Sequence, residues 1–176
     1  MTDFCLDRFI ADARDAATSP DAARRIERLM QRAFADPDAI AAAIPAFEED
    51  EVILFEDETV SVWHERFHPH EVLPPHDHAM TAVIGVYRGR ERNRLFRPGH
   101  DGRLAPGGCL DLSAGQTHVF GPEDVHTVQG LDGAPSLGLH VYLGALTRTQ
   151  RNLYDWDSLR PIPMTGADFD RLKRAA

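Results

Sequence analysis

Two histidines separated by a single residue, His76 and His78, are the side chains of this sequence best suited to chemistry. In a β-strand, residues two apart point to the same side, so both imidazoles face one way and Asp77 faces the other. Neutral imidazole is a common ligand of zinc, iron, copper and nickel. The preceding Pro74-Pro75 stiffens the segment and adds no competing charge. The pair therefore predicts part of a metal site.

The residues from the pair onward resemble the first motif of the cupin superfamily, in which His-x-His is followed at fixed spacing by a glutamate and a glycine. His76, His78 and Gly89 match this motif, whereas the glutamate position is occupied by Ala82. The usual carboxylate ligand is therefore missing. The resemblance implies a double-stranded β-helix, and the missing glutamate implies a site built from histidines.

Among cupins, a three-histidine site without a carboxylate is typical of the thiol dioxygenases, meaning cysteine dioxygenase and 3-mercaptopropionate dioxygenase. The sequence is most similar to bacterial proteins that are grouped with these enzymes as metal-dependent double-stranded β-helix proteins. The segments that carry the resemblance are Pro74–His78, Ala82–Tyr87, Asp124–His126, Leu139–Tyr142 and, in the tail, Asp155–Asp157. It implies a mononuclear Fe(II) site.

By this resemblance, the third metal ligand is His126. The position also fits the local pattern, because His126 follows the Gly121-Pro122 turn and lies at the start of the apolar run Val125–Val128. The segment lacks the proline-x-glycine order and the final asparagine of a second cupin motif. His118, which lies on another short apolar run, is the alternative ligand.

His140 and Tyr142 form a second pair on one strand face. In thiol dioxygenases a Ser-x-His-x-Tyr triad lies beside the iron, and the histidine orients the tyrosine toward substrate and dioxygen. The resemblance gives this catalytic role to Tyr142 and His140, but the serine position is Gly138. A core pair in which histidine and tyrosine satisfy each other is the alternative. Ala82 and Val83 stand where some of these enzymes have a cysteine linked to the tyrosine, so we expect no such crosslink.

A thiol acid needs a cation for its carboxylate, since an unpaired buried carboxylate is costly. The arginine that cysteine dioxygenase uses upstream of the metal motif has no counterpart, and Asp50 falls near that place. The mercaptopropionate branch has an arginine shortly after the tyrosine. Arg151 is the matching substrate-binding candidate and Arg148 the second, although either arginine also suits an exposed loop.

These assignments predict an enzyme, a mononuclear non-haem iron dioxygenase that oxidises a small thiol of the cysteine or 3-mercaptopropionate type to a sulfinate. The expected partners are that thiol and dioxygen, and a homodimer is left open. Three histidines also suit zinc, nickel or copper. Two alternatives stand beside this reading: a non-catalytic metal-dependent cupin that binds or senses a small ligand, and a different cupin reaction, an isomerase or another oxidoreductase, on the same ligands.

The elements that must position these residues change in character near residue 51. Before it, apolar residues at helical spacing predict helices that begin after a cap at Thr2 or Asp3, run from Ser19 to about Phe34, and run from Asp36 to near Pro45. After it, turn residues separate short apolar runs at 52–55, 59–63, 81–87, 95–97, 110–112, 118–120, 125–128 and 137–143. A closing helix is expected at Gly166–Ala175.

This density of strands predicts a mainly β fold, a cupin double-stranded β-helix or jelly-roll barrel with an N-terminal helical segment. We expect one domain over residues 1–176, in which 1–50 form the helices, 51–145 the barrel and 146–176 a C-terminal tail. A barrel of this size has room for a metal ion and a small ligand.

Charge and composition exclude several classes of partner. Lys and Arg number 19 against 28 Asp and Glu, a net charge of −9, which argues against duplex DNA and anionic membranes. The alternating arginines at 88, 90, 92 and 94 predict a solvent-exposed strand face, with Glu91 among them. Charged residues near the N-terminus argue against an export signal, and the two cysteines, Cys5 and Cys109, form no disulfide framework. We therefore expect a cytoplasmic protein.

Overall fold

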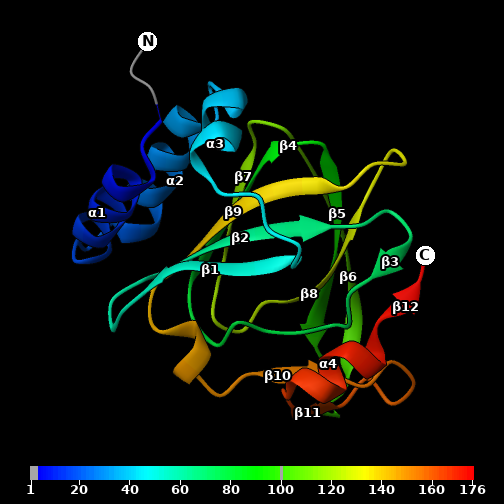
Figure 1. Cartoon of the computed structure of the whole chain (residues 1–176). Coiled ribbons are helices and arrows are strands. Elements are labelled where there is room, and N and C mark those ends of the chain that lie inside the picture. Colours follow the sequence, from blue (N-terminus) through cyan, green and yellow to red (C-terminus); the bar gives the residue numbers. More distant parts are fainter. Residues whose placement is uncertain (1–3, 100) are drawn as a thin grey trace.

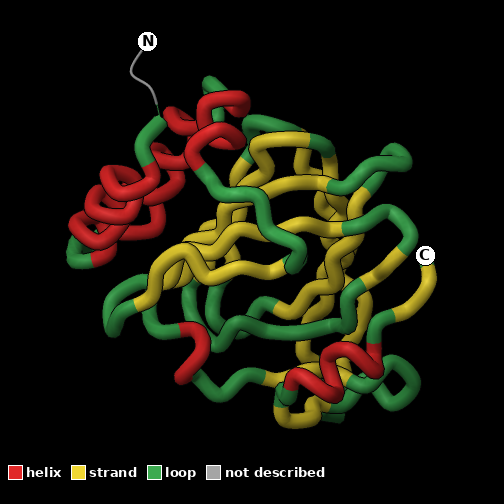
Figure 2. Tube along the Cα trace, in the orientation of Figure 1, coloured by secondary structure: helices red, strands yellow, loops and turns green. Residues whose placement is uncertain are grey.

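The computed structural model describes residues 4–99 and 101–176, with helices gathered in the N-terminal third and strands in most of the remainder (Figures 1 and 2). The N-terminal helices are α1 (Leu6–Ala17), α2 (Ala22–Ala33) and α3 (Pro37–Ala43). The cap expected at Thr2 or Asp3 lies outside the described residues. None of the helices within the described ranges combines the length and apolar character that a bilayer crossing requires.

The strands of the barrel follow the predicted runs, and each run overlaps one strand. They are β1 (Glu51–Glu56), β2 (Ser61–Phe67), β3 (Glu71–Val72), β4 (Ala82–Arg88), β5 (Arg90–Pro98), β6 (Leu104–Ser113), β7 (Thr117–Phe120), β8 (Val125–Gly130) and β9 (Ser136–Tyr142). One sheet has the order β1-β2-β9-β4-β7 and another the order β6-β5-β8, with antiparallel neighbours throughout. Side chains of both sheets share one interior core, which includes Ile84 of β4 and Leu112 of β6. The predicted double-stranded β-helix is therefore confirmed.

The first sheet is buried on both faces. On β4, Val83 and Tyr87 pack with the helices, whereas Ala82, Ile84 and Val86 alternate with them and belong to the barrel interior. The helices α1, α2 and α3 cover the outer face (Figure 1). This two-sided burial explains why the β4 sequence reads as an almost continuous apolar run.

The C-terminal tail lies across one end of the barrel (Figure 1). It consists of a short 3-10 turn (Leu146–Arg148), β10 (Asn152–Tyr154), β11 (Pro161–Pro163), α4 (Gly166–Leu172) and β12 (Arg174–Ala175). The closing helix is shorter than the predicted 166–175, because Arg174 and Ala175 pair with β3 instead. Within the tail, Trp156 donates a hydrogen bond from Nε1 to the Leu172 carbonyl at 2.7 Å, which fixes the segment after β10 to the end of α4.

Two of the alternating arginines are less exposed to solvent than predicted, because they form ion pairs. Arg92 makes a two-pronged ion pair with Asp111 at 2.7 and 2.8 Å, and Arg90 reaches the same carboxylate at 3.0 Å. Glu91 points the other way and is fully buried. The period of two along β5 therefore separates an ion-paired outer face from a polar inner one.

Candidate metal centre

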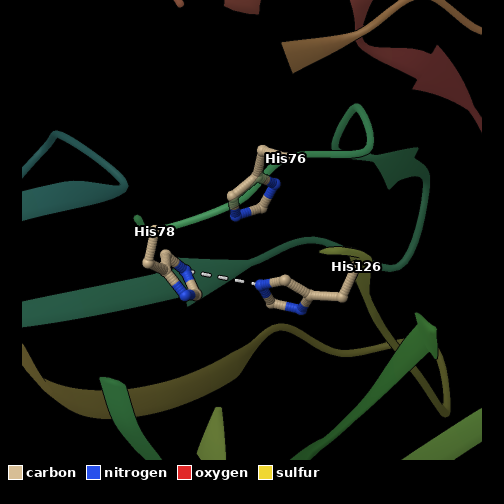
Figure 3. Close-up of side chains that lie close together, drawn as sticks. All are labelled: His76, His78 and His126. Atoms are coloured by element: carbon tan, nitrogen blue, oxygen red, sulfur yellow. Dashed lines mark hydrogen bonds between the residues drawn. The ribbon is translucent and has the colours of Figure 1, made fainter. Parts of the chain in front are cut away.

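His76, His78 and His126 converge in the barrel interior, with one ring nitrogen from each lying within 4.8 Å of the others (Figure 3). All are buried, with 7%, 2% and 2% of their surface exposed. His76 and His78 do not lie in a continuous strand, because their segment pairs through isolated bridges from His76, one to Leu153 of β10 and one to His126. The second bridge exchanges backbone hydrogen bonds of 3.0 and 3.1 Å with His126, which lies in β8, and so holds the two segments side by side.

Hydrogen bonds determine which nitrogen of two of these rings is available for a ligand. His76 Nδ1 is 2.9 Å from the Pro74 carbonyl, which can only accept, so Nδ1 carries the proton. His126 Nδ1 is 2.7 Å from Asn93 Oδ1 and donates in the same way. The Nε2 atoms of His76 and His126 therefore keep their lone pairs, as a metal ligand requires.

A buried chain of polar groups supports His126 from behind. Asn93 Nδ2 donates to Glu91 Oε1 at 3.0 Å, which fixes the amide so that its oxygen faces His126. The other carboxylate oxygen of Glu91 lies 3.4 Å from the Ser136 hydroxyl. Burial raises the pKa of Glu91 to about 7. These residues resemble the supporting groups that orient histidine ligands in metal sites.

Burial keeps the three imidazoles neutral at pH 7. It lowers the pKa of His76 to about 4, and it lowers the pKa of His78 and of His126 well below the usual value. The charge of each neighbouring ring acts in the same direction for His78 and His126. Three uncharged imidazole rings thus face one another.

The residues present fit a metal ion. Nε2 of His78 and Nε2 of His126 are 3.4 Å apart (Figure 3), and two nitrogens bound to one ion at about 2.1 Å would lie about 3.0 to 3.4 Å apart. The other ring nitrogen of His78 has no hydrogen-bond partner in the part of the chain that the structure describes. Nitrogen donors alone suit several divalent metals, so the donor set does not identify one.

His118, the alternative ligand, lies outside this group. The Phe120 ring is next to both histidines, with its centroid 4.4 Å from that of His126 and 4.7 Å from that of His118. Within residues 4–99 and 101–176, His118 does not join the nitrogen cluster. The structure therefore brings together the three histidines that the sequence favoured.

Tyr142 and His140 lie next to the histidine cluster. The Tyr142 ring centroid is 5.2 Å from that of His78, and the Tyr142 hydroxyl is 3.2 Å from His140 Nδ1. Burial lowers the pKa of His140 to about 3 and raises the pKa of Tyr142 well above its usual value. Both side chains are therefore neutral at pH 7 and joined by a hydrogen bond.

Gly138 leaves His140 Nε2 without a partner among the described residues. A Cβ added at Gly138 would lie 3.4 Å from that nitrogen but only 2.7 Å from the Gly85 carbonyl of the neighbouring strand. A serine at this position would thus require the two strands to move apart.

Arg151 lines the same cavity as the histidines, which has a volume of about 570 Å³. Asp77, turned away from the cluster, positions the segment that carries Arg151. The Asp77 carboxylate accepts hydrogen bonds from Asn152 N at 3.0 Å and from Asn152 Nδ2 at 2.8 Å. Arg148, the second candidate, also lines this cavity, but its side chain is exposed and forms an ion pair with Glu58. Of the two arginines, Arg151 is therefore the better placed to meet a bound ligand.

Sequence reasoning missed Asn93, Glu91 and Asp77. The signal for the first two was present, because Glu91 and Asn93 alternate with the arginines and so must face the opposite side of β5. Asp77 gave no comparable signal, since its partner Asn152 is far away in the sequence.

No protein family model matches the chain. Solved structures that are similar include an uncharacterised protein with a double-stranded β-helix domain from Klebsiella pneumoniae, 17% identical over 65% of this chain and 92% of that one, with a TM-score of 0.47. A cupin superfamily protein from Desulfitobacterium hafniense is 15% identical over 59% of this chain and 86% of that one, with a TM-score of 0.46. A hydroquinone 1,2-dioxygenase from Sphingomonas sp. TTNP3 is 12% identical over 61% and 73%, with a TM-score of 0.47. At these identities the likeness concerns the fold alone, and none of these structures points to the thiol dioxygenases in particular.

Proposed function

We propose that the protein is a mononuclear Fe(II) dioxygenase that oxidises a small thiol to a sulfinate. The observation that carries the proposal is the buried group of three neutral histidines with no carboxylate in it, beside the Tyr142–His140 pair. His76, His78 and His126 would hold the metal. The overall reaction is balanced without a further reductant, because both atoms of dioxygen pass to sulfur and the thiol proton is released.

When bound, the iron would supply a centre that favours the thiolate and makes dioxygen reactive. The side chains around it have separate tasks. The Tyr142 hydroxyl, held by His140 Nδ1 at 3.2 Å, would hydrogen-bond the reacting groups. Arg151 would bind a carboxylate on the substrate, and apolar neighbours such as Phe120 keep water away from the rings.

Oxygen uptake tests the proposal. The protein is reconstituted anaerobically with Fe(II) and then offered cysteine, cysteamine or 3-mercaptopropionate in aerated buffer, with the sulfinate measured by mass spectrometry. We expect one thiol to drive oxygen consumption with equal formation of its sulfinate. His126→Ala should abolish this uptake, whereas His118→Ala, which removes a histidine outside the cluster, should retain it.

Uptake with none of the thiols by an iron-loaded protein would contradict the proposal. That result would favour a non-catalytic metal-dependent cupin that binds or senses a ligand. Gly138 is the feature that agrees with this second reading, because it leaves His140 without the serine found in the enzymes that the sequence resembles.

A further inference from the structure

The cavity above the histidine cluster contains carboxylates that the proposed reaction does not use. Glu65 and Glu51 line it together with Arg151 and the three histidines. Its volume of about 570 Å³ is ordinary for a small-molecule site. A metal and a thiol alone need no acidic side chain in their surroundings, so the role of these carboxylates is open.

Glu65 is buried without the partner that a carboxylate needs. It is 2% exposed, and its Oε2 accepts no hydrogen bond from any of the described residues. An unpaired buried carboxylate is costly, which makes Glu65 a poor choice for a purely structural position. Its charged neighbours do not relieve the cost, because burial and the charges of Glu51 and Glu91 raise the pKa of Glu65 well above the usual value, while Arg151 acts in the opposite direction.

The register of the sheet places Glu65 beside the catalytic pair. On β2, Glu65 is directly opposite Gly138 of β9, and Trp63 is opposite His140. Because Gly138 has no side chain, the space between Glu65 and His140 is not filled by that residue. A Cβ at Gly138 would lie 3.4 Å from His140 Nε2, which has no partner among the described residues; Trp63 Nε1 and His78 Nδ1, which belong to other residues of this cavity, are also without one. Glu65 Oε2 and His140 Nε2, both without a partner, thus lie near the glycine that replaces the serine.

The charges of this part of the cavity favour a cation. Arg151 favours the charged form of both Glu65 and Glu51, and Lys173 also favours that of Glu51, whereas the charges of Glu51, Glu91 and Asp50 disfavour the charged form of Glu65. A ligand with only a thiol and a carboxylate could use Arg151 but would leave Glu65 without a partner. A ligand with an ammonium group supplies the hydrogen-bond donor and the charge that Glu65 lacks.

Building on the proposed function, we propose that Glu65, with Glu51 beside it, forms a binding site for an ammonium group, and that the substrate is a small thiol which also carries a primary amine. The thiol end lies toward His76, His78 and His126, and the amine end lies toward Glu65 across Gly138. Arg151 remains available for a carboxylate if the aminothiol has one.

A matched pair of probes tests this site without turnover. Cysteamine and 2-mercaptoethanol have the same thiol and the same chain length and differ in an ammonium or a hydroxyl end. Their binding to the zinc-loaded protein is measured anaerobically by calorimetry. We expect cysteamine to bind about 10- to 100-fold more tightly. Glu65→Gln should reduce this ratio to near one and leave the affinity for 2-mercaptoethanol unchanged, whereas Glu123→Gln, which removes an exposed carboxylate from a turn, should leave the ratio intact.

Two results would overturn the proposal: equal affinities of the wild-type protein for both thiols, or the same preference in Glu65→Gln. The second result would mean that the amine binds the metal directly. Should Glu65→Gln fail to fold, competition in the wild-type protein decides: propylamine, which has no thiol, should displace cysteamine, and 1-propanol should not. Failure of propylamine to compete would equally refute the ammonium site.

The outcome is independent of the oxidation chemistry. An ammonium preference in the zinc-loaded protein, with no oxygen uptake by the iron-loaded protein, supports the subsite and rejects the dioxygenase. Oxygen uptake with 3-mercaptopropionate, with no preference for cysteamine, rejects the subsite and supports the dioxygenase.

Discussion

Asn93 determines the chemistry of His126 although it does not belong to the histidine cluster. Its Oδ1 accepts the Nδ1 proton at 2.7 Å, and its Nδ2 is held by Glu91 at 3.0 Å, so the amide cannot easily turn over. The lone pair on Nε2 of His126 is therefore prepared before any metal arrives. This support could be predicted only in part from the sequence, because alternation places Asn93 on the inner face of β5 but does not pair it with β8.

We expect Asn93→Ala to weaken metal binding by about 10- to 100-fold, because His126 would lose the partner that orients its ring and selects its tautomer. Competition with a fluorescent zinc chelator measures the effect. The control is His118→Ala, which should bind zinc as the wild-type protein does. An Asn93→Ala protein with unchanged zinc affinity would show that His126 needs no such support.

The buried histidines make the metal-free protein sensitive to acid. Burial holds the pKa of His76 at about 4 and that of His140 at about 3, against about 6.5 in the unfolded chain. Above pH 6.5 these rings are neutral in both states, so they do not affect the pH dependence there. Below pH 6.5, these histidines become protonated in the unfolded chain but stay neutral in the folded protein. The free energy of unfolding therefore decreases as the pH falls toward 4.

Urea unfolding of the EDTA-treated protein at pH 7 and pH 5 should therefore show a loss on the order of 2 kcal/mol for each of these two histidines. His140→Asn should reduce the loss, whereas His70→Gln, which replaces an exposed histidine, should leave it unchanged. Equal stability at the two pH values would mean that the rings are not buried in the metal-free protein.

Among the elements, the long strands were predictable and the short tail strands were not. Runs such as Thr81–Tyr87 are recognisable from the local sequence because they are apolar throughout. One face of the strand packs against the helices and the other against the barrel interior. The strands β10, β11 and β12 have two or three residues each, and their pairing depends on partners elsewhere in the chain. The pairing of the segment His76–His78 was unpredictable for the same reason, since its place is set by isolated bridges from His76 to β8 and to β10.

Asp77 connects this segment to the tail, and its loss should loosen β10. In Asp77→Ala, the backbone and side-chain amides of Asn152 would lose their acceptor, at a cost of about 1 to 3 kcal/mol in the free energy of unfolding. Hydrogen exchange followed by mass spectrometry should show faster exchange in residues 150–163 and unchanged exchange in β4 and β9.

The matched control is Asp157→Ala, because Asp157 lies in the same tail but pairs with Arg174 at the surface. An exposed pair of this kind contributes little, so the control should exchange as the wild-type protein does. Equal exchange in the two variants would contradict the view that Asp77 anchors the segment that carries Arg151.

At the scale of the whole molecule, the fold buries its polar groups where two sheets and a tail meet. The N-terminal helices cover one face of the first sheet, and the tail crosses one end of the barrel (Figure 1). The fold class and the three histidines were predictable from patterns in the sequence and from its resemblance to cupins. Glu65 and Gly138 were not seen as neighbours, because the register between β2 and β9 is a long-range property that no local pattern reveals.

The central claim is that His76, His78 and His126 hold a single metal ion, and metal analysis tests it most directly. Wild-type protein and the variants His126→Ala and His118→Ala are loaded with Fe(II) anaerobically, desalted and analysed by mass spectrometry for metal content per chain. We expect one iron per chain for wild type and His118→Ala, and none retained by His126→Ala. Equal iron in all three proteins, or none in the wild type, would contradict it.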